Sequence, residues 1–423
     1  MTVEFITLGC KVNQYETQAM KEAFSLYGVS PVSSGADIIV INSCSVTAES
    51  DRKTRQALNR AKRNNPGAIT VLTGCMVQAF PDASKNLGAD LVIGNKDVSA
   101  VVEKTIKTAN SKTRDFSYSP HETGDKYNTP NITAFEDRTR AFMKIEDGCD
   151  RFCSYCIIPY ARGRVRSKSI ENIKTEAESL AENGFSEVVL VGINLSAYGK
   201  GESFNLCDAV DAVCSVGGIK RVRLGSLEPD HITDEMLSRF KAQEKFCPQF
   251  HLSLQSGSNK TLKQMNRHYD TAFYADLVER IRKIFKDAAI TTDIMVGFSG
   301  ETEEDFEDSV DFVKKIGFAR AHVFPYSVRP GTVAENYGDK IPNSEKARRA
   351  HIMQQTAALC EKEFLKTLVG KTVSVLFERN NEGYTENYSK VKLIGEQVPE
   401  GTIQSVKITE AFDTHVSGTL SNI

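Results

Sequence analysis

Residues 141–168 read AFMKIEDGCDRFCSYCIIPYARGRVRSK, and this stretch decides the fold. A short strand-like run, AFMKIEDG, leads into three cysteines spaced CxxxCxxC: Cys149, Cys153 and Cys156. Enzymes built on a (β/α) barrel place their chemistry on the loops that follow the strands. A structural zinc site needs four ligands, whereas three thiolates on a four-iron cluster leave one iron open. The spacing therefore favours an iron–sulfur cluster, with a zinc site completed by a distant fourth ligand, or three unrelated thiols, as the alternatives.

The same stretch begins a longer alternation of strand-like and helix-like segments. The strand-like segments are AFMKIEDG, EVVLVGIN, RVRLGSLEP, FHLSLQSGS, TTDIMVGFS and AHVFPYSV. Six strands with helical crossovers predict an open (β/α)6 barrel, because eight strands are needed to close one. Within the first crossover, SIENIKTEAESLAENG offers Ser169 as the N-cap and Gly184 as the C-cap of a helix.

Upstream of the barrel, residues 3–108 alternate short β-branched runs with amphipathic stretches, which predicts a parallel α/β sheet. Three more cysteines, Cys10, Cys44 and Cys75, each lie just past the end of a predicted strand. The carboxyl ends of parallel strands share one edge of a sheet, so these thiols are expected to converge. They suit a second cluster with an open iron. The alternative is that they are buried cysteines acting as small apolar residues.

The chain divides into three predicted domains. An α/β domain covers residues 1–115, the partial barrel covers residues 135–366, and the last domain covers residues 369–423. A polar stretch from Asn110 to about Thr133 is expected to be a linker. The last domain has only strand-like runs, which predict a small five-stranded barrel of OB-like type. The four other cysteines have no paired spacing and are expected to be structural: Cys207, Cys214, Cys247 and Cys360.

Composition narrows the functional classes. The 423 residues are 40% hydrophobic and 26% charged, which excludes a disordered or fibrous protein. Because 53 Lys+Arg nearly balance 55 Asp+Glu, any nucleic-acid surface must be a local patch. No apolar run is long enough to span a membrane, and Glu4 and Lys11 interrupt any signal-like start. We therefore expect a cytoplasmic protein with no membrane partner, whose ten cysteines serve metal or redox chemistry.

The order of domains and the wording of the motifs resemble the radical S-adenosylmethionine (SAM) methylthiotransferases over essentially the whole chain. In that family the last domain is called TRAM and binds RNA. The matching motifs are GCKVNQYE, INSCSVT, LTGC, IEDGCDRFCSYCIIPYARGRVRSK, LGSLEP, LQSGS and DIMVGFSGET. GCKVNQYET is similar to the MtaB-like branch. That branch adds a methylthio group to carbon 2 of N6-threonylcarbamoyladenosine, next to the anticodon in tRNA.

The resemblance implies two [4Fe-4S] clusters and SAM as cofactors. Its partners would be tRNA and an electron-donating reductase such as a flavodoxin or ferredoxin. Both cysteine triplets would be cluster ligands and catalytic. The barrel cluster would split SAM into a radical that removes hydrogen from the substrate, and the N-terminal cluster would carry the sulfur to be methylated and transferred.

Five further residues at strand ends are predicted to hold SAM: Tyr155 beside the adenine, Asn194, Glu228, Gln255 and the backbone around Gly297. The alternative for each is a polar residue that satisfies a strand end or a helix cap. Asn13 and Glu16 are expected either to order the loop that carries Cys10 or simply to begin a helix.

RNA contact is predicted for the cation-rich run after the barrel cysteines, which contains Arg162, Arg164, Arg166 and Lys168. A solvated charged face is the alternative. In the last domain, Phe377, Tyr384 and Tyr388 could stack on bases, but we expect them to form its core.

Other functions remain open at this level. Sister branches of the family act on isopentenyladenosine in tRNA or on an aspartate of a ribosomal protein. A different class would be an iron–sulfur electron carrier or an RNA-binding protein without turnover. Such a protein would not cleave SAM.

Overall fold

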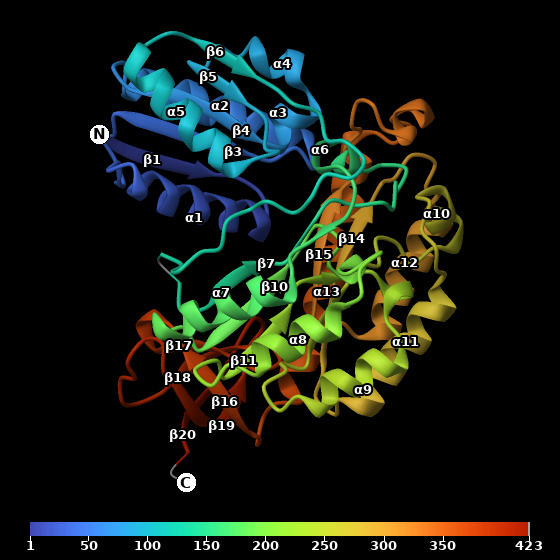
Figure 1. Cartoon of the computed structure of the whole chain (residues 1–423). Coiled ribbons are helices and arrows are strands. Elements are labelled where there is room, and N and C mark those ends of the chain that lie inside the picture. The colour runs from blue at the N-terminus through green and yellow to red at the C-terminus, as the bar shows by residue number, and fades with distance from the viewer. Residues whose placement is uncertain (137, 422–423) are drawn as a thin grey trace.

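The computed structural model describes residues 1–136 and 138–421 and arranges them as three domains in chain order (Figure 1). The N-terminal α/β domain and the small C-terminal β domain lie at opposite ends, with the partial barrel between them (Figure 1). Within the described residues, no helix is long and apolar enough to cross a membrane.

The N-terminal domain is built on a fully parallel sheet, as the alternation predicted. In spatial order its strands are β2 (Ser30–Pro31), β1 (Thr2–Thr7), β3 (Ile38–Ser43), β4 (Ile69–Gly74), β5 (Leu91–Ile93) and β6 (Asp115–Ser117). Its helices are α1 (Lys11–Leu26), α2 (Ala48–Asn64), α3 (Cys75–Ala79), α4 (Pro81–Lys85) and α5 (Val98–Ser111).

Helices cover both faces of this sheet, and its central strand β3 is buried throughout. All six residues of β3 are buried. Ile38 and Val40 pack with residues of α1 and α5, whereas Ile39 and Ile41 pack with residues of α2. This alternation is what a central parallel strand requires.

The segment expected to be a free linker is packed instead. Its first part forms β6, which pairs with β5 and extends the sheet two residues past the expected domain end at 115. Further along, Ile132 and Phe135 are buried in the core that the N-terminal domain shares with the barrel. Tyr127 donates a hydrogen bond of 2.6 Å to the backbone oxygen of Lys144. The polar composition concealed these few apolar anchors.

The central domain is the predicted open barrel. Its parallel strands form two sheets: β7 (Ala141–Lys144), β10 (Glu187–Val191) and β11 (Arg221–Leu224) in one, and β12 (Ser226–Leu227), β13 (Gln249–Leu252), β14 (Ala289–Val296) and β15 (Arg320–Pro325) in the other. The strand predicted over RVRLGSLEP is split into β11 and β12 at Gly225. Among the described residues, β7 and β15 are not paired, so the barrel stays open.

Helices surround the barrel on the outside: α6 (Ile158–Arg162), α7 (Ile170–Glu182), α8 (Leu206–Cys214), α9 (Asp234–Ala242), α10 (Asn259–Gln264), α11 (Thr271–Ile284) and α12 (Glu303–Ile316). The long helix α13 (Asn343–Lys366) packs along β15 and leads to the last domain. Ser169 caps α7 as predicted, because its side chain accepts from the backbone N–H of Asn172. The expected C-cap is wrong by one residue. The C-cap is Asn183, and Gly184 follows it with φ +87°.

The last domain is a closed five-stranded barrel, which confirms the prediction. Its strands are β16 (Thr372–Phe377), β17 (Glu382–Thr385), β18 (Lys390–Leu393), β19 (Ile403–Ala411) and β20 (Val416–Leu420). Phe377 is fully buried in its core, as expected. The core expectation is wrong for Tyr384 and Tyr388, which stack on each other with ring centroids 4.8 Å apart and are only half-buried.

The two stacked tyrosines lie where the last domain meets the open barrel. The guanidinium of Arg140 lies 4.6 Å from the Tyr384 ring centroid, and that of Arg223 lies 4.7 Å from the Tyr388 ring centroid. Arg223 also donates to the backbone oxygen of Glu386 at 2.8 Å. Glu187, which is fully buried, accepts from Arg223 at 3.1 Å. This paired cluster fixes the last domain against β10 and β11.

Candidate active site

The first cysteine triplet lies at one edge of the N-terminal sheet. Cys10 caps the start of α1, Cys44 follows β3, and Cys75 begins α3 directly after β4. Strands β1, β3 and β4 are neighbours, so all three cysteines are brought to the same edge. The approach is tight, because a side chain at Gly9 would place its Cβ only 2.7 Å from Cβ of Cys44.

The second triplet lies on the loop between β8 (Glu146–Asp147) and α6, at the mouth of the barrel. Strand β8 pairs with β9 (Arg166–Ser167), which closes this loop into a compact hairpin. The backbone N–H of Cys149 donates to Gly163 at 3.0 Å, and that of Cys156 donates to Cys153 at 2.9 Å. The three thiols are partly buried.

An arginine donates to a sulfur in each triplet. Arg162 Nε lies 3.2 Å from Sγ of Cys75, and Arg267 Nη1 lies 3.1 Å from Sγ of Cys153. Burial raises the pKa of the Cys75 thiol to about 12, and nearby Arg162 partly opposes that shift. Thiolates that ligate iron are anionic and are stabilised by hydrogen bonds to sulfur. The donor set therefore fits a thiolate-bound cluster at each triplet.

Each triplet supplies three thiols and one cationic donor. A structural zinc site takes four ligands, whereas a four-iron cluster can take three cysteines, each on a different iron, and leave the fourth iron open. The two sets of three thiols therefore suit the larger group.

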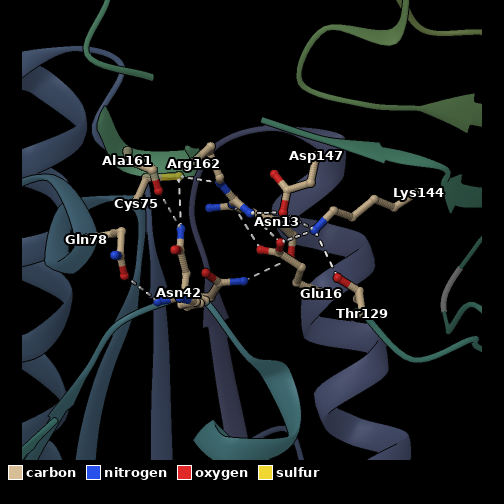
Figure 2. A network of polar contacts seen from close by, with 12 residues as sticks. Asn13, Glu16, Asn42, Cys75, Gln78, Thr129, Lys144, Asp147, Ala161 and Arg162 are labelled. Atoms are coloured by element: carbon tan, nitrogen blue, oxygen red, sulfur yellow. Dashed lines mark hydrogen bonds and ion pairs between the residues drawn. The ribbon is translucent and has the colours of Figure 1, made fainter. Parts of the chain in front are cut away.

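Figure 2 shows the network that joins the N-terminal triplet, through Cys75, to the barrel domain. Arg162 of α6 is fully buried and reaches across to α1, where it donates to both carboxylate oxygens of Glu16 and, at 2.8 Å, to Oδ1 of Asn13. Lys144 joins from β7, with Nζ 2.7 Å from both Glu16 and Asp147. The buried charges are thus paired in one connected set.

This network shows what Asn13 and Glu16 do at the start of α1. Asn13 and Glu16 are both buried, and Asn13 also donates to the backbone oxygens of Leu8 at 2.8 Å and Ser43 at 2.9 Å. Burial alone would raise the pKa of Glu16, but Arg162 and Lys144 lower it below its usual value. The two side chains therefore order the loop that carries Cys10.

The predicted RNA contacts are wrong for three of the four cations after the barrel cysteines. Arg162 is buried in the network, Arg166 is buried and paired with Asp147 at 3.2 Å, and Lys168 is buried and paired with Glu176. Buried, paired cations have no free surface to offer a phosphate. Only Arg164 keeps an exposed side chain, which pairs with Asp150 at 3.3 Å.

The residues predicted to hold SAM lie around the barrel mouth. Tyr155 packs edge-on against Phe298, and Glu228 accepts from Arg267, the same arginine that donates to Cys153. Gln255 is buried with φ +73°, and its backbone pairs with β14. The backbone N–H of Gly297 donates to Glu301 at 3.0 Å.

Asn194 lies beside an acidic residue that the sequence did not single out. Its backbone N–H donates to Glu146 at 2.7 Å. Oε1 of Glu146 and Oδ1 of Asn194 are both buried with no hydrogen-bond partner. Burial raises the pKa of Glu146 well above its usual range. Arg267 was also missed. Glu146 stands in the quoted motif that begins IEDGC, but no role was predicted for it, because both residues acquire their neighbours only through the fold.

A cavity of about 680 Å³ lies between the Cys10 loop and the inside of the barrel. One wall carries Gly9, Cys10, Lys11 and Gln14, and the opposite wall carries side chains of β10, β11, β13, β14 and β15. Tyr388 of the last domain contributes to the rim. All three domains therefore border one chamber, and a cysteine of the N-terminal triplet faces it.

Comparison with known proteins agrees with this arrangement. Residues 143–313 match the Radical SAM superfamily, and residues 2–94 match the family described as "Uncharacterized protein family UPF0004". A solved structure of the radical SAM methyltransferase TsrM from Kitasatospora setae has a similar fold, with a TM-score of 0.58 and 14% identity, over 79% of this chain and 73% of that one. The fold and site define a radical SAM protein.

Curated relatives show to which family of radical SAM proteins the chain belongs. The threonylcarbamoyladenosine tRNA methylthiotransferase MtaB of Thermotoga maritima is 37% identical over 96% of this chain and 94% of its own. Its counterpart from Bacillus subtilis is 36% identical over 97% and 94%. A tRNA-2-methylthio-N(6)-dimethylallyladenosine synthase from Rickettsia conorii is 32% identical over 97% and 98%. The chain belongs to the MtaB-type family of radical SAM methylthiotransferases, whose cofactors are SAM and two [4Fe-4S] clusters.

Removing the buried guanidinium should destabilise the protein strongly. Arg162→Met removes the two-pronged partner of Glu16 and leaves Lys144 as the cation beside that carboxylate. Removing one partner of a buried ion pair costs up to about 3–5 kcal/mol. The exposed neighbour provides the control, since Arg164→Met should change stability by less than about 0.5 kcal/mol. Chemical unfolding of both variants measures the difference. Equal stabilities would show that the network does not hold the domains together.

Stability should also fall on mild acidification because of His121. Its burial, with the nearby charge of Arg166, lowers its pKa to about 4. The unfolded imidazole titrates near 6.5, so the unfolded state binds more protons between these two values. The free energy of unfolding should therefore decrease as the pH falls from about 6.5 to about 4.

Thermal unfolding of wild type and His121→Gln at several pH values tests this expectation. The variant should lose part of the pH dependence and match the wild type more closely at acidic than at neutral pH. Parallel curves for the two proteins would assign the acid sensitivity to other groups.

Proposed function

We propose that this protein replaces the hydrogen on carbon 2 of N6-threonylcarbamoyladenosine in tRNA with a methylthio group. The observation that carries the proposal is the shared chamber, because Cys10 of one triplet faces the interior of the barrel whose mouth holds the other. A reaction that needs both sulfur transfer and hydrogen removal at one carbon requires two such sites to meet at one substrate. The curated MtaB relatives support the same reaction.

The chain's own residues position and insulate this chemistry. When bound, the clusters and SAM supply the radical that removes hydrogen and the sulfur that replaces it. Arg267 and Glu228, paired at the barrel mouth, hold the Cys153 side of the site. We assign SAM positioning to Tyr155, Asn194, Glu228, Gln255 and Gly297, which border that mouth. The buried network around Arg162 excludes water between the triplets.

The RNA backbone is proposed to bind the outer face of α2. Arg55, Arg60 and Arg63 are exposed, and none has a carboxylate partner among the described residues. Lys53, Gln56, Asn59, Arg60 and Arg63 line a groove with Ile6 and Leu8, which belong to the segment that leads to Cys10. A row of free cations beside the site is what phosphate contacts require. Arg164 adds one exposed cation beside the barrel cysteines.

The proposal places the protein in the cytoplasm with its tRNA substrate. A low-potential reductase of the flavodoxin or ferredoxin class would supply electrons to the clusters. The isopentenyladenosine branch is the second candidate, since a relative of that branch is also similar over most of the chain. A non-catalytic electron carrier is the alternative of another class. SAM cleavage under reducing conditions would exclude that alternative.

The first test is the nucleoside content of cellular tRNA. Liquid chromatography and mass spectrometry of digested tRNA should show loss of the methylthio-threonylcarbamoyl nucleoside in cells without the gene. The wild type and Cys360→Ala should restore it, whereas Cys153→Ala and Cys44→Ala should not. Loss of only the isopentenyl derivative would assign the protein to the sister branch, and no change in either nucleoside would refute tRNA methylthiolation.

Charge reversal on α2 tests the RNA surface. The triple variant Arg55→Glu, Arg60→Glu, Arg63→Glu should bind tRNA at least about tenfold more weakly, and its log–log salt dependence should be shallower by about two. The matched control reverses three exposed cations on the outside of the barrel: Lys283 on α11, Lys286 in the turn that follows it, and Lys315 on α12. Fluorescence anisotropy at several salt concentrations measures both quantities. Equal weakening in the two triple variants would place the RNA elsewhere.

A further inference from the structure

Two cations from different domains line the chamber, and their nearest carboxylates, Glu187 and Glu361, act on them from beyond ion-pair distance. Lys11 begins α1 next to Cys10, and Arg320 begins β15 on the opposite wall. Neither forms an ion pair within residues 1–136 and 138–421. The closest aromatic contact of Lys11 is the Phe142 ring, with Nζ 5.6 Å from its centroid. Two domains thus each contribute one unpaired cation to the same chamber.

The other charged groups of the chamber are already paired. Asp293 lies 3.3 Å from Nε2 of His251, whose Nδ1 lies 3.0 Å from the hydroxyl of Thr291. Arg223 is paired with Glu187 and donates to backbone oxygens of the last domain. Among the described residues that line the chamber, Asp293 is the one carboxylate, against the three cations Lys11, Arg223 and Arg320, so positive charge is in excess there.

Lys11 and Arg320 both act electrostatically on the ring of His322. His322 lines the chamber with its ring centroid 6.1 Å from that of His251. The charges of both Lys11 and Arg320 disfavour its protonated form, so both lie within electrostatic range of this ring. Such a concentration of positive charge is relieved by an anionic ligand.

We infer that Lys11 and Arg320 bind the carboxylate of the threonylcarbamoyl group. This inference rests on the proposed function. The N6 substituent of the substrate carries a carboxylate, a hydroxyl and a urea-like linkage, whereas an isopentenyl substituent is wholly apolar. A chamber with two cations outside any ion pair and a His–Thr–Asp hydrogen-bonding wall complements the polar groups of the first substituent, whereas the second would leave those groups without a partner. The two residues would determine which modified adenosine the enzyme accepts.

The test compares anticodon hairpins that differ in one group. One carries the natural threonylcarbamoyl adenosine, a second carries its threoninamide analogue without the carboxylate charge, and a third carries isopentenyladenosine. Binding to the cluster-loaded protein is measured anaerobically by fluorescence anisotropy. The wild type should bind the acid at least about tenfold more tightly than the amide, because a charge-assisted pair is lost.

The variants are Lys11→Met, Arg320→Met and, as a control, Lys314→Met, whose side chain is exposed on α12 outside the chamber. The first two should bind the acid and the amide with similar affinity, while their affinity for the isopentenyl hairpin stays unchanged. Lys11→Arg should retain the preference for the acid. Because Lys11 neighbours a cysteine of the triplet, Arg320→Met provides the variant that cannot disturb that loop directly.

Two outcomes overturn the inference. If Arg320→Met and Lys11→Met keep the preference of the wild type for the acid, the carboxylate binds elsewhere. If they weaken SAM binding in equilibrium dialysis without changing the hairpin preference, the cations serve the cofactor.

Methylthiolation of the natural hairpin by the wild type is measured in parallel. Its absence would count against the proposed function, whereas its presence with unchanged selectivity in the variants would count only against this assignment.

Discussion

The buried guanidinium of Arg162 is the interaction on which the rest of the structure depends. It lies at the end of a short helix of the barrel, yet its partners are Glu16 and Asn13 of the first helix and the sulfur of Cys75 in the N-terminal domain. A charge without solvent needs a full set of partners, and only the docked arrangement of the two domains provides them. The orientation of one domain on the other is therefore set by chemistry at the site itself.

The same geometry determines how the two cysteine triplets relate. Each triplet has its own arginine that donates to one of its sulfurs, Arg162 to Cys75 and Arg267 to Cys153. Arg162 is in turn held by Glu16, and Arg267 by Glu228. Cationic donors to sulfur lower the cost of the negative charge that thiolate ligation brings. Beside Cys10 lies the chamber, bordered by all three domains. A substrate in that space would meet groups from each domain at once, which no single domain could offer.

The packed linker and the last domain make this arrangement rigid. Tyr127 and Ile132 fasten the linker onto the shared core, and Glu187 with its arginines fastens the small barrel to β10 and β11. The cation-rich run after the barrel cysteines is mostly internal, because Arg162, Arg166 and Lys168 are held in buried pairs. The unpaired cations that border the site lie on the outer face of α2 and in the wall of the chamber.

Much of the fold could be predicted because its signals are local. The strand and helix periods, the Ser169 cap and the closed C-terminal barrel all follow from near neighbours in the chain. The convergence of Cys10, Cys44 and Cys75 was also predictable, since parallel strands end at a common edge. The linker was predicted less well. Its polar composition concealed a few buried residues whose partners are distant in the sequence.

The sequence by itself determined the order of the domains and the position of both thiol triplets, because strand ends and short spacings place those residues. Only the tertiary structure decided which charges are free. Arg162 and Arg164 are the same residue type two positions apart in the sequence. Arg162 is buried among three partners from the other domain, whereas Arg164 is exposed. Lys11 and Arg320 are brought to one chamber from opposite ends of the chain. Burial and pairing depend on long-range contacts, and the spacing of residues along the chain does not predict those contacts.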